Sequence, residues 1–240
     1  MHRKKVLLFG GNGRIGNIIL NDLSNEFSVT NVDTSKESAS PCQKYVQYKN
    51  LNDLNKIYKN QDFYAVIHCQ QLKPKGFMDL NFSSIKLSDF EKIMEINLKL
   101  SFISAQKYVK RCEKRKGNYP GRLINFVSTY SIISSNPSLY DGTEMGNPAH
   151  YTISKAGLWG LTKYIAANFR DLNVLCNSIS PHGVENKQSK EFKKTFSKRS
   201  PLSRLSEPSE ILPAVNFLLD ENNTYTNGAN IPIDGGWTSC

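Results

Sequence analysis

Short apolar segments alternate with amphipathic helical segments along this chain, and that alternation constrains the fold more than any other feature. In the first pair, residues 6–9 are a continuous apolar run and residues 14–23 carry apolar side chains at helical spacing. Strands separated by helices in this way run parallel and are joined by right-handed crossovers. The pattern therefore predicts an α/β fold with a doubly wound parallel sheet.

The expected elements follow one another without a linker or a break in composition, so we expect a single domain over residues 1–240. Strands are expected at 6–9, 27–32, 45–48, 64–69, 121–127, 174–179 and 230–233, and helices at 14–23, 51–58, 89–114, 150–170 and 208–219. The polar, turn-rich segments 34–44 and 72–84 are expected to be loops.

A glycine-rich turn, Gly10-Gly11-Asn12-Gly13-Arg14-Ile15-Gly16, joins the first expected strand to the first helix. Glycines permit a tight turn there and let backbone N–H groups approach a pyrophosphate at the helix N-terminus. Asp33 ends the second strand, where an acid accepts hydrogen bonds from an adenosine ribose. These features predict a Rossmann fold that binds NAD. Because Arg14 and Lys36 soften the repulsion of a 2′-phosphate, NADP stays possible.

Tyr151 and Lys155 lie four residues apart in the expected helix 150–170, so both side chains rise from one helical face. A phenol has an ordinary pKa of about 10, and a neighbouring ammonium lowers the pKa by stabilising the phenolate. The pair is therefore suited to moving a proton to or from a substrate oxygen.

Taken together, these motifs resemble the short-chain dehydrogenase/reductase family, nearly from end to end. The matching segments are Gly10–Gly16, Asn97, Ile124–Ser128, the Tyr151 and Lys155 pair, Pro181–Val184 and Asp234–Gly236. Phe9 stands where the family has threonine, and Arg14 stands where it has its middle glycine. The sequence His68-Cys69-Gln70-Gln71 replaces the family's Asn-Asn-Ala-Gly.

The resemblance implies an NAD(P)-dependent oxidoreductase that acts on a secondary alcohol or ketone. Tyr151 would be the acid/base, and Lys155 would lower the pKa of Tyr151 and bind the nicotinamide ribose. Ser128 would hydrogen-bond the substrate oxygen, and Asn97 would hold a water or a backbone kink. The expected dinucleotide contacts are Gly10, Asn12, Gly13, Arg14, Ile15, Gly16, Asp33, Asn50, Leu51, His68, Tyr151, Lys155, Pro181, Gly183 and Val184.

Two segments are expected to shape the substrate site. An insertion of about residues 135–150 separates Ser128 from Tyr151 by more than most family members have, and it loosely resembles a subgroup associated with surface-polysaccharide and flagellin-glycan sugars. A flap of about residues 185–200 is expected over the substrate, and its segment Gln188–Arg199 carries several cations against the single acid Glu191. Those cations are Lys190, Lys193, Lys194, Lys198 and Arg199. They favour an anionic substrate such as a sugar phosphate or nucleotide sugar.

Two alternatives remain open at this point. The basic surface also suits a 3-oxoacyl-[acyl-carrier-protein] reductase, because carrier proteins are acidic. A non-catalytic dinucleotide-binding regulatory protein would share the fold without the chemistry. The combination of Asn97, Ser128, Tyr151 and Lys155 argues against that second alternative.

Composition excludes several other classes of protein. The net charge of +10 comes without a nucleic-acid-binding motif, and no apolar stretch approaches the roughly 20 residues of a membrane span. Five scattered cysteines and four histidines show no disulfide framework and no metal-ligand spacing. We expect a soluble cytoplasmic protein with no metal, no nucleic-acid partner and no membrane partner. A small-molecule substrate and a homodimer or homotetramer complete the expectation.

Overall fold

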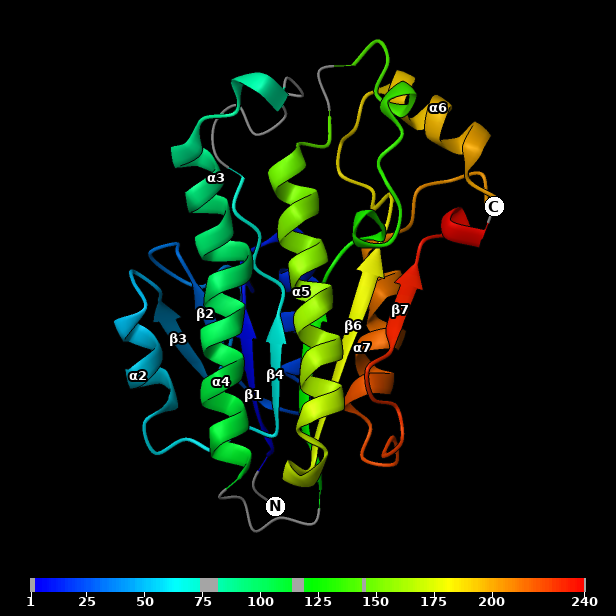
Figure 1. Ribbon diagram of the computed structural model, residues 1–240. Coiled ribbons are helices and arrows are strands. Elements are labelled where there is room, and N and C mark those ends of the chain that lie inside the picture. The colour runs from blue at the N-terminus through cyan, green and yellow to red at the C-terminus, as the bar shows by residue number, and fades with distance from the viewer. Residues whose placement is uncertain (1–2, 74–81, 114–118, 144–145, 240) are drawn as a thin grey trace.

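The computed structural model describes residues 3–73, 82–113, 119–143 and 146–239 and contains a seven-stranded parallel sheet (Figure 1). The strands lie in the order β3-β2-β1-β4-β5-β6-β7. Their bounds are β1 Lys5–Phe9, β2 Ser28–Asp33, β3 Lys44–Gln47, β4 Ala65–His68, β5 Gly121–Phe126, β6 Val174–Pro181 and β7 Asn230–Ile233. The predicted doubly wound α/β fold is confirmed.

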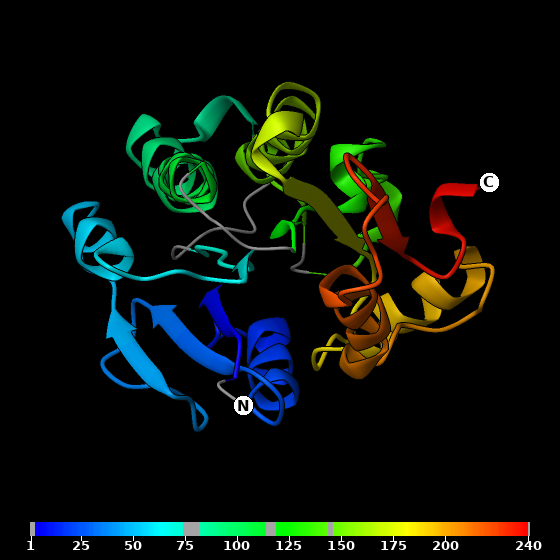
Figure 2. The ribbon, with the colours of Figure 1, turned by 90° about the horizontal axis from the view of Figure 1, so that it is seen from below.

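Helices cover both faces of this sheet, as the view along the strands in Figure 2 shows. One face carries α2 (Asn52–Tyr58), α4 (Leu100–Cys112) and α5 (Ala149–Asn168), and the other carries α1 (Arg14–Leu23) and α7 (Leu212–Leu219). Side chains of β1 alternate between the two cores, since Leu7 packs with the first group and Leu8 with the second. Burial on both faces explains why the central strands are apolar throughout.

The strand order reverses between β1 and β4, and ligands of open α/β sheets bind outside the carboxyl ends of the strands at such a point. In Figure 1 these ends point upward, toward α6 (Lys190–Arg199) and the 3₁₀ turn Pro137–Leu139 of the insertion. The topology therefore places the glycine turn, the end of β5 and the start of α5 around one space.

Most element bounds agree with the sequence-based predictions, but two elements differ. The expected helix 89–114 begins earlier, as α3 (Leu87–Met94), and is interrupted by a π-helical segment at Glu95–Lys99 before α4. The expected flap contains the helix α6, where only a cationic flap was predicted. Residue 114, residues 74–81 of the expected loop and residues 144–145 of the insertion lie outside the described residues. In the part of the chain that the structure describes, no helix combines the length and the apolar character needed to cross a membrane.

Candidate active site

A cavity of about 1080 Å³ opens at the carboxyl ends of the strands. Its lining brings together the glycine turn after β1, Asp33 after β2, Ser128 after β5 and Tyr151 on α5. Residues from the insertion and from α6 close one end of it. Its size is that of a site for a large cofactor with a small substrate beside it.

The glycine turn is packed too tightly for side chains at two of its positions. A Cβ atom on Gly16 would lie 2.0 Å from the carbonyl oxygen of Gly10, and one on Gly10 would lie 2.5 Å from the Cα atom of Gln70. Gly10 also has φ of +80°, which favours glycine. No side chain caps the N-terminus of α1, so the N–H groups of its first turn point toward the cavity without a side-chain acceptor. This cradle fits a pyrophosphate.

Asp33 is held at the rim of the same cavity by backbone donors. Its Oδ2 atom accepts a hydrogen bond from the N–H of Asn12 at 3.0 Å, and its Oδ1 atom accepts one from Thr34 at 2.7 Å. The Asn12 side chain donates to the carbonyl of Glu37 at 2.7 Å, which ties the loop after β2 to the glycine turn. The carboxylate therefore lies where a ribose attached to the pyrophosphate would reach it.

Lys155 reaches the cavity from α5 with its amine buried. The Nζ atom donates a hydrogen bond to the backbone carbonyl of Phe126 at 2.8 Å. Burial lowers the pKa of Lys155 to about 8, while Cys69 opposes that shift and the charge of Lys73 adds to it. The amine thus gains and loses its proton near physiological pH.

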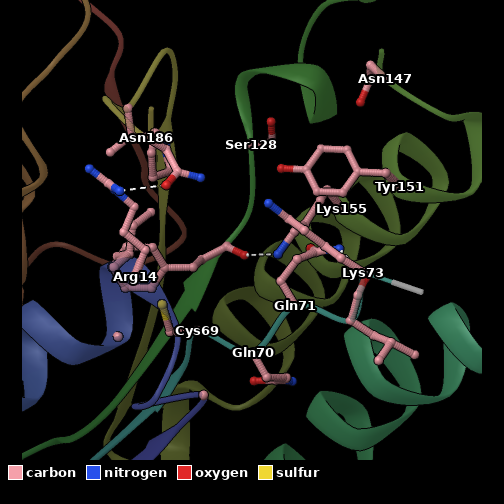
Figure 3. Close-up of a pocket in the computed structure, with 18 of the residues that line it drawn as sticks. Arg14, Cys69, Gln70, Gln71, Lys73, Ser128, Asn147, Tyr151, Lys155 and Asn186 are labelled. Atoms are coloured by element: carbon pink, nitrogen blue, oxygen red, sulfur yellow. Dashed lines mark hydrogen bonds between the residues drawn. The ribbon is translucent and has the colours of Figure 1, made fainter. Parts of the chain in front are cut away.

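Ser128 lies beside the hydroxyl group of Tyr151, next to Lys155 (Figure 3). Burial raises the pKa of Tyr151, and a hydrogen bond with Ser128 partly offsets that increase. The sequence-based expectation was a pKa lowered by Lys155. The net direction is the opposite, because the buried phenol loses hydration and the Lys155 amine, 5.9 Å from the ring centroid, already donates to Phe126.

Asn97 lies behind the cavity wall and does not line it. It belongs to the π-helical segment, a kind of irregularity that is frequent at functional sites. Its Oδ1 atom accepts from the N–H of Leu72 at 2.9 Å, and its Nδ2 atom donates to Ser154 at 3.3 Å. Asn97 therefore joins the loop after β4 to α5.

The remaining end of the cavity is aromatic. The hydroxyl groups of Tyr130 and Tyr140 lie 2.6 Å apart, and the Tyr140 ring stacks on Phe192 of α6 with centroids 5.9 Å apart. His182 packs against Phe196 and Trp237, whose rings also stack on each other, and burial lowers the pKa of His182 to about 4, so its ring is neutral. The insertion, α6 and the end of the chain thus form one wall.

Three of the expected dinucleotide contacts are not part of the lining, namely Asn50, Leu51 and His68. The His68 ring is buried between Asn125 at 2.8 Å and Ser104 at 2.7 Å, so its hydrogen bonds are made inside the core. The other expected contacts line the cavity: Gly10, Asn12, Gly13, Arg14, Ile15, Gly16, Asp33, Tyr151, Lys155, Pro181, Gly183 and Val184.

The structure places the cations of the expected flap outside the cavity lining, and their attraction for an anionic substrate stays a prediction. None of Lys190, Lys193, Lys194, Lys198 and Arg199 lines the cavity. Helix α6 turns Phe192 and Phe196 inward, and its cations face away, with Lys193 paired to Glu185 at 2.6 Å. The spacing of the two phenylalanines, four residues apart, is the signal that could have revealed this face.

Sequence reasoning also missed several lining residues, notably Lys73, Asn147 and Gln71. Figure 3 shows Lys73 extending toward Tyr151 and Lys155, and Asn147 above the phenol. Arg14, on the other side of the cavity, donates to Asn186 at 2.6 Å. Nothing in the local sequence distinguishes Lys73 from an ordinary loop lysine.

A protein-family model described as "Enoyl-(Acyl carrier protein) reductase" matches residues 52–238. Among curated proteins, the 3-oxoacyl-[acyl-carrier-protein] reductase of Aquifex aeolicus is 29% identical over 162 residues, which is 66% of this chain and 60% of that protein. The Rickettsia bellii enzyme of the same name is 30% identical and aligns over 59% of its length. The chain thus spans about three fifths of the length of the curated relatives it matches.

Solved structures match over more of the chain. A short-chain dehydrogenase from Leptospira borgpetersenii with bound NAD+ has a TM-score of 0.88 and 25% identity, and the match covers 99% of this chain and 94% of that one. A gluconate 5-dehydrogenase from Burkholderia cenocepacia has a TM-score of 0.84 at 18% identity, with coverage of 100% and 97%, and shows likeness of fold alone.

Proposed function

This chain belongs to the short-chain dehydrogenase/reductase family, and from that premise we propose that it is an NAD(P)-dependent oxidoreductase acting on a secondary alcohol or ketone. One observation carries the proposal. Tyr151, Ser128 and Lys155 converge in the same cavity as an uncapped glycine turn that fits a pyrophosphate. A dinucleotide seated there would supply or accept the hydride.

The protein's own side chains carry out the proton transfer of the reaction. With a ketone as substrate, the Tyr151 hydroxyl donates its proton to the substrate oxygen as negative charge develops there, and with an alcohol the transfer runs in reverse. The raised pKa of Tyr151 keeps the phenol protonated, which suits the donor role. Ser128 is the neighbouring hydroxyl that can hydrogen-bond the same oxygen and stabilise its charge.

Lys155 and Asn97 support Tyr151 and Ser128 without contacting the substrate oxygen themselves. The Lys155 amine is fixed by the Phe126 carbonyl, and with its pKa near 8 it can return a proton to the phenol between turnovers. Asn97 positions the loop after β4 against α5 and does not itself reach the reacting atoms.

NAD is the proposed cofactor, with NADP as the less favoured form. Asp33 presents a carboxylate at the ribose position, and the lining next to it comes from the neutral residues Thr34 and Ser35. Lys36, which was expected to soften repulsion of a 2′-phosphate, does not line the cavity. The Leptospira borgpetersenii relative was solved with NAD+, in agreement with this preference.

For the substrate we propose a sugar, sugar phosphate or nucleotide sugar. Around Tyr151 the lining combines aromatic rings, such as Phe192, with polar groups from the insertion, such as Thr143 and Asn147. Rings that stack on C–H faces and amides that bind hydroxyls are what a polyhydroxylated ring requires. The second candidate is a 3-oxoacyl-[acyl-carrier-protein] reductase, which the names of the curated relatives favour.

We also propose a homodimer or homotetramer that uses the outer faces of α4 and α5. Phe102 on α4 is 46% exposed, and on α5 Ile153 and Tyr164 are 45% and 59% exposed. Large apolar side chains grouped on an outer surface are typical of an interface. Sedimentation or light scattering at several concentrations would test the assembly.

The deciding experiment for activity is a substrate screen that follows reduced nicotinamide by absorbance, with NAD and NADP tested in parallel. The screen contains sugars, sugar phosphates, nucleotide sugars and a 3-oxoacyl thioester. Turnover of the thioester alone would favour the second candidate. Tight dinucleotide binding without turnover of any alcohol or ketone would instead favour a regulatory protein.

A further inference from the structure

Cations outnumber acids in the described lining of the cavity. Arg14, Lys73, Lys155 and Lys187 line it, against Asp33 and Glu191. Asp33 lies at the ribose end and is engaged by backbone donors, and Glu191 lies on α6. Glu191 is thus the only carboxylate of this set that does not belong to the ribose end.

Lys73 and Lys187 are the two cations of this set that belong neither to the glycine turn nor to the pair with Tyr151. Arg14 lies in the glycine turn and donates to Asn186, whereas Lys73 is on the other side of the cavity, directed toward Tyr151 and Lys155 (Figure 3). Its Nζ atom forms no hydrogen bond or ion pair with any described residue, although its charge acts on Lys155.

The backbone that leads to Lys73 is fixed. The Leu72 N–H donates to Asn97 at 2.9 Å, and the Gln70 side chain donates to the carbonyl of Ile96 at 3.1 Å and to Ser101 at 2.7 Å. The π-helical segment supplies two of these acceptors, Asn97 and Ile96. Lys73 therefore follows a segment whose backbone and side chains are tied to the π-helical segment and to Ser101.

Two amines that face one space repel each other, and an oxyanion between them removes that repulsion. Lys155 already uses one of its donors on Phe126. We propose that Lys73 recognises an anionic oxygen group of the substrate, a carboxylate or a phosphate, next to the reacting carbon. This inference rests on the proposed function and adds the residue that selects charged substrates over neutral ones.

Direct binding tests the inference without requiring turnover. Protein saturated with NADH is titrated with inorganic phosphate, and in a second arm with acetate, at constant ionic strength kept with sodium chloride. Binding is read from the midpoint of thermal unfolding and from calorimetry. The variants are Lys73→Met, Lys73→Arg and, as a matched control on the outer face of α6, Lys194→Met.

We expect Lys73→Met to weaken binding of the preferred anion at least 10-fold, Lys73→Arg to stay within about 3-fold of wild type, and Lys194→Met to bind as wild type does. The stronger of the two arms identifies phosphate or carboxylate as the recognised group. Equal binding by wild type and Lys73→Met, or no binding of either anion by wild type, would overturn the inference.

A kinetic arm compares 3-oxobutanoate with its neutral ethyl ester, which share one ketone. In Lys73→Met, the ratio of kcat/KM for acid over ester should fall at least 10-fold, whereas Lys194→Met should leave it unchanged. An unchanged ratio in Lys73→Met contradicts the inference. Absence of turnover of both ketones by wild type counts against the proposed function on these substrates, and the binding arm then decides the role of Lys73 alone.

Discussion

The hydroxyl groups of Tyr130 and Tyr140 share a hydrogen bond of 2.6 Å, which joins the 3₁₀ turn after Ser128 to the inserted segment. The Tyr140 ring also stacks on Phe192, so the same residue links the insertion to α6. Removing this one hydroxyl should therefore disturb the substrate end of the cavity and leave the dinucleotide end intact.

For Tyr140→Phe we expect KM for the substrate to rise about 3- to 10-fold, with little change in the affinity for NADH. The free energy of unfolding should fall by about 1 kcal/mol, because Tyr130 loses a buried hydrogen-bond partner. Steady-state kinetics and urea denaturation measure the two effects. Tyr225→Phe is the control, since Tyr225 is 100% exposed. Identical behaviour of the two variants would contradict the proposed role of the insertion.

Replacing Tyr151 with Phe should lower kcat by about 10²- to 10⁴-fold, because the proton donor is lost. The dissociation constant for NADH, measured by fluorescence titration, should change less than about 3-fold. Tyr164→Phe removes a hydroxyl from the exposed side of the same helix and should retain full turnover. Undiminished turnover in Tyr151→Phe would refute the assignment of the acid/base.

Gly16→Ala should weaken NAD binding at least 10-fold, because the new Cβ atom would lie 2.0 Å from the carbonyl of Gly10 and open the turn. Gly160→Ala offers a matched control on α5, where nothing lies within 4 Å of the added atom. There the free energy of unfolding should rise by about 0.5–1 kcal/mol, since Ala has the higher helix propensity. Calorimetric titration and urea denaturation measure both, and tight NAD binding by Gly16→Ala would be the contrary result.

The buried amine of Lys155 predicts a pH-dependent stability. Its pKa falls from 10.5 to about 8, and each unit is worth about 1.4 kcal/mol, so the charged amine destabilises the fold by about 3 kcal/mol. Below pH 8 this cost is fully present. Between pH 8 and 10.5 the folded chain releases the proton before the unfolded chain does, and the cost disappears.

The free energy of unfolding of Lys155→Met minus that of wild type should therefore be about 2–3 kcal/mol larger at pH 7 than at pH 10. Urea denaturation of both proteins at the two pH values measures this difference. A difference that is constant with pH, or that grows toward pH 10, would mean that the amine is not desolvated in the folded protein.

Asp33→Ser should change the choice of cofactor. Loss of the carboxylate removes hydrogen bonds to the adenosine ribose and the repulsion of a 2′-phosphate. The ratio of kcat/KM for NADP over NAD should rise at least 10-fold. Asp22→Ser, on α1 and outside the cavity lining, serves as the control and should leave that ratio unchanged. An unaltered ratio in Asp33→Ser would place the ribose elsewhere.

The regular elements were predictable because their signals are local. Helix α1 and strand β7 have the bounds that periodicity and glycine positions predict. The π-helical segment at Glu95–Lys99 could not be predicted in the same way, because its contacts are with a distant segment: Asn97 and Ile96 accept hydrogen bonds from the loop after β4.

The residues that line the cavity could be predicted where a sequence motif identifies them, but not where tertiary packing decides which side chains face inward. Gly10, Gly16, Asp33, Ser128, Tyr151 and Lys155 all line it, as their motifs predicted. His68 was placed at the cofactor, but its ring is satisfied in the core by Asn125 and Ser104. Lys73 lines the cavity and the five cations of α6 do not, because the sequence shows charge and only packing decides which side of α6 faces the cavity.

The acceptor that anchors Lys155 is the main-chain oxygen of Phe126, which every amino acid carries. Substitution of the side chain at residue 126 leaves this hydrogen-bond acceptor in place. A slip of β5 by one residue against β6, where Phe126 is aligned with Ile179, would carry the oxygen away. The position of the Lys155 amine therefore depends on the register of β5 against β6 and not on the side chain at residue 126.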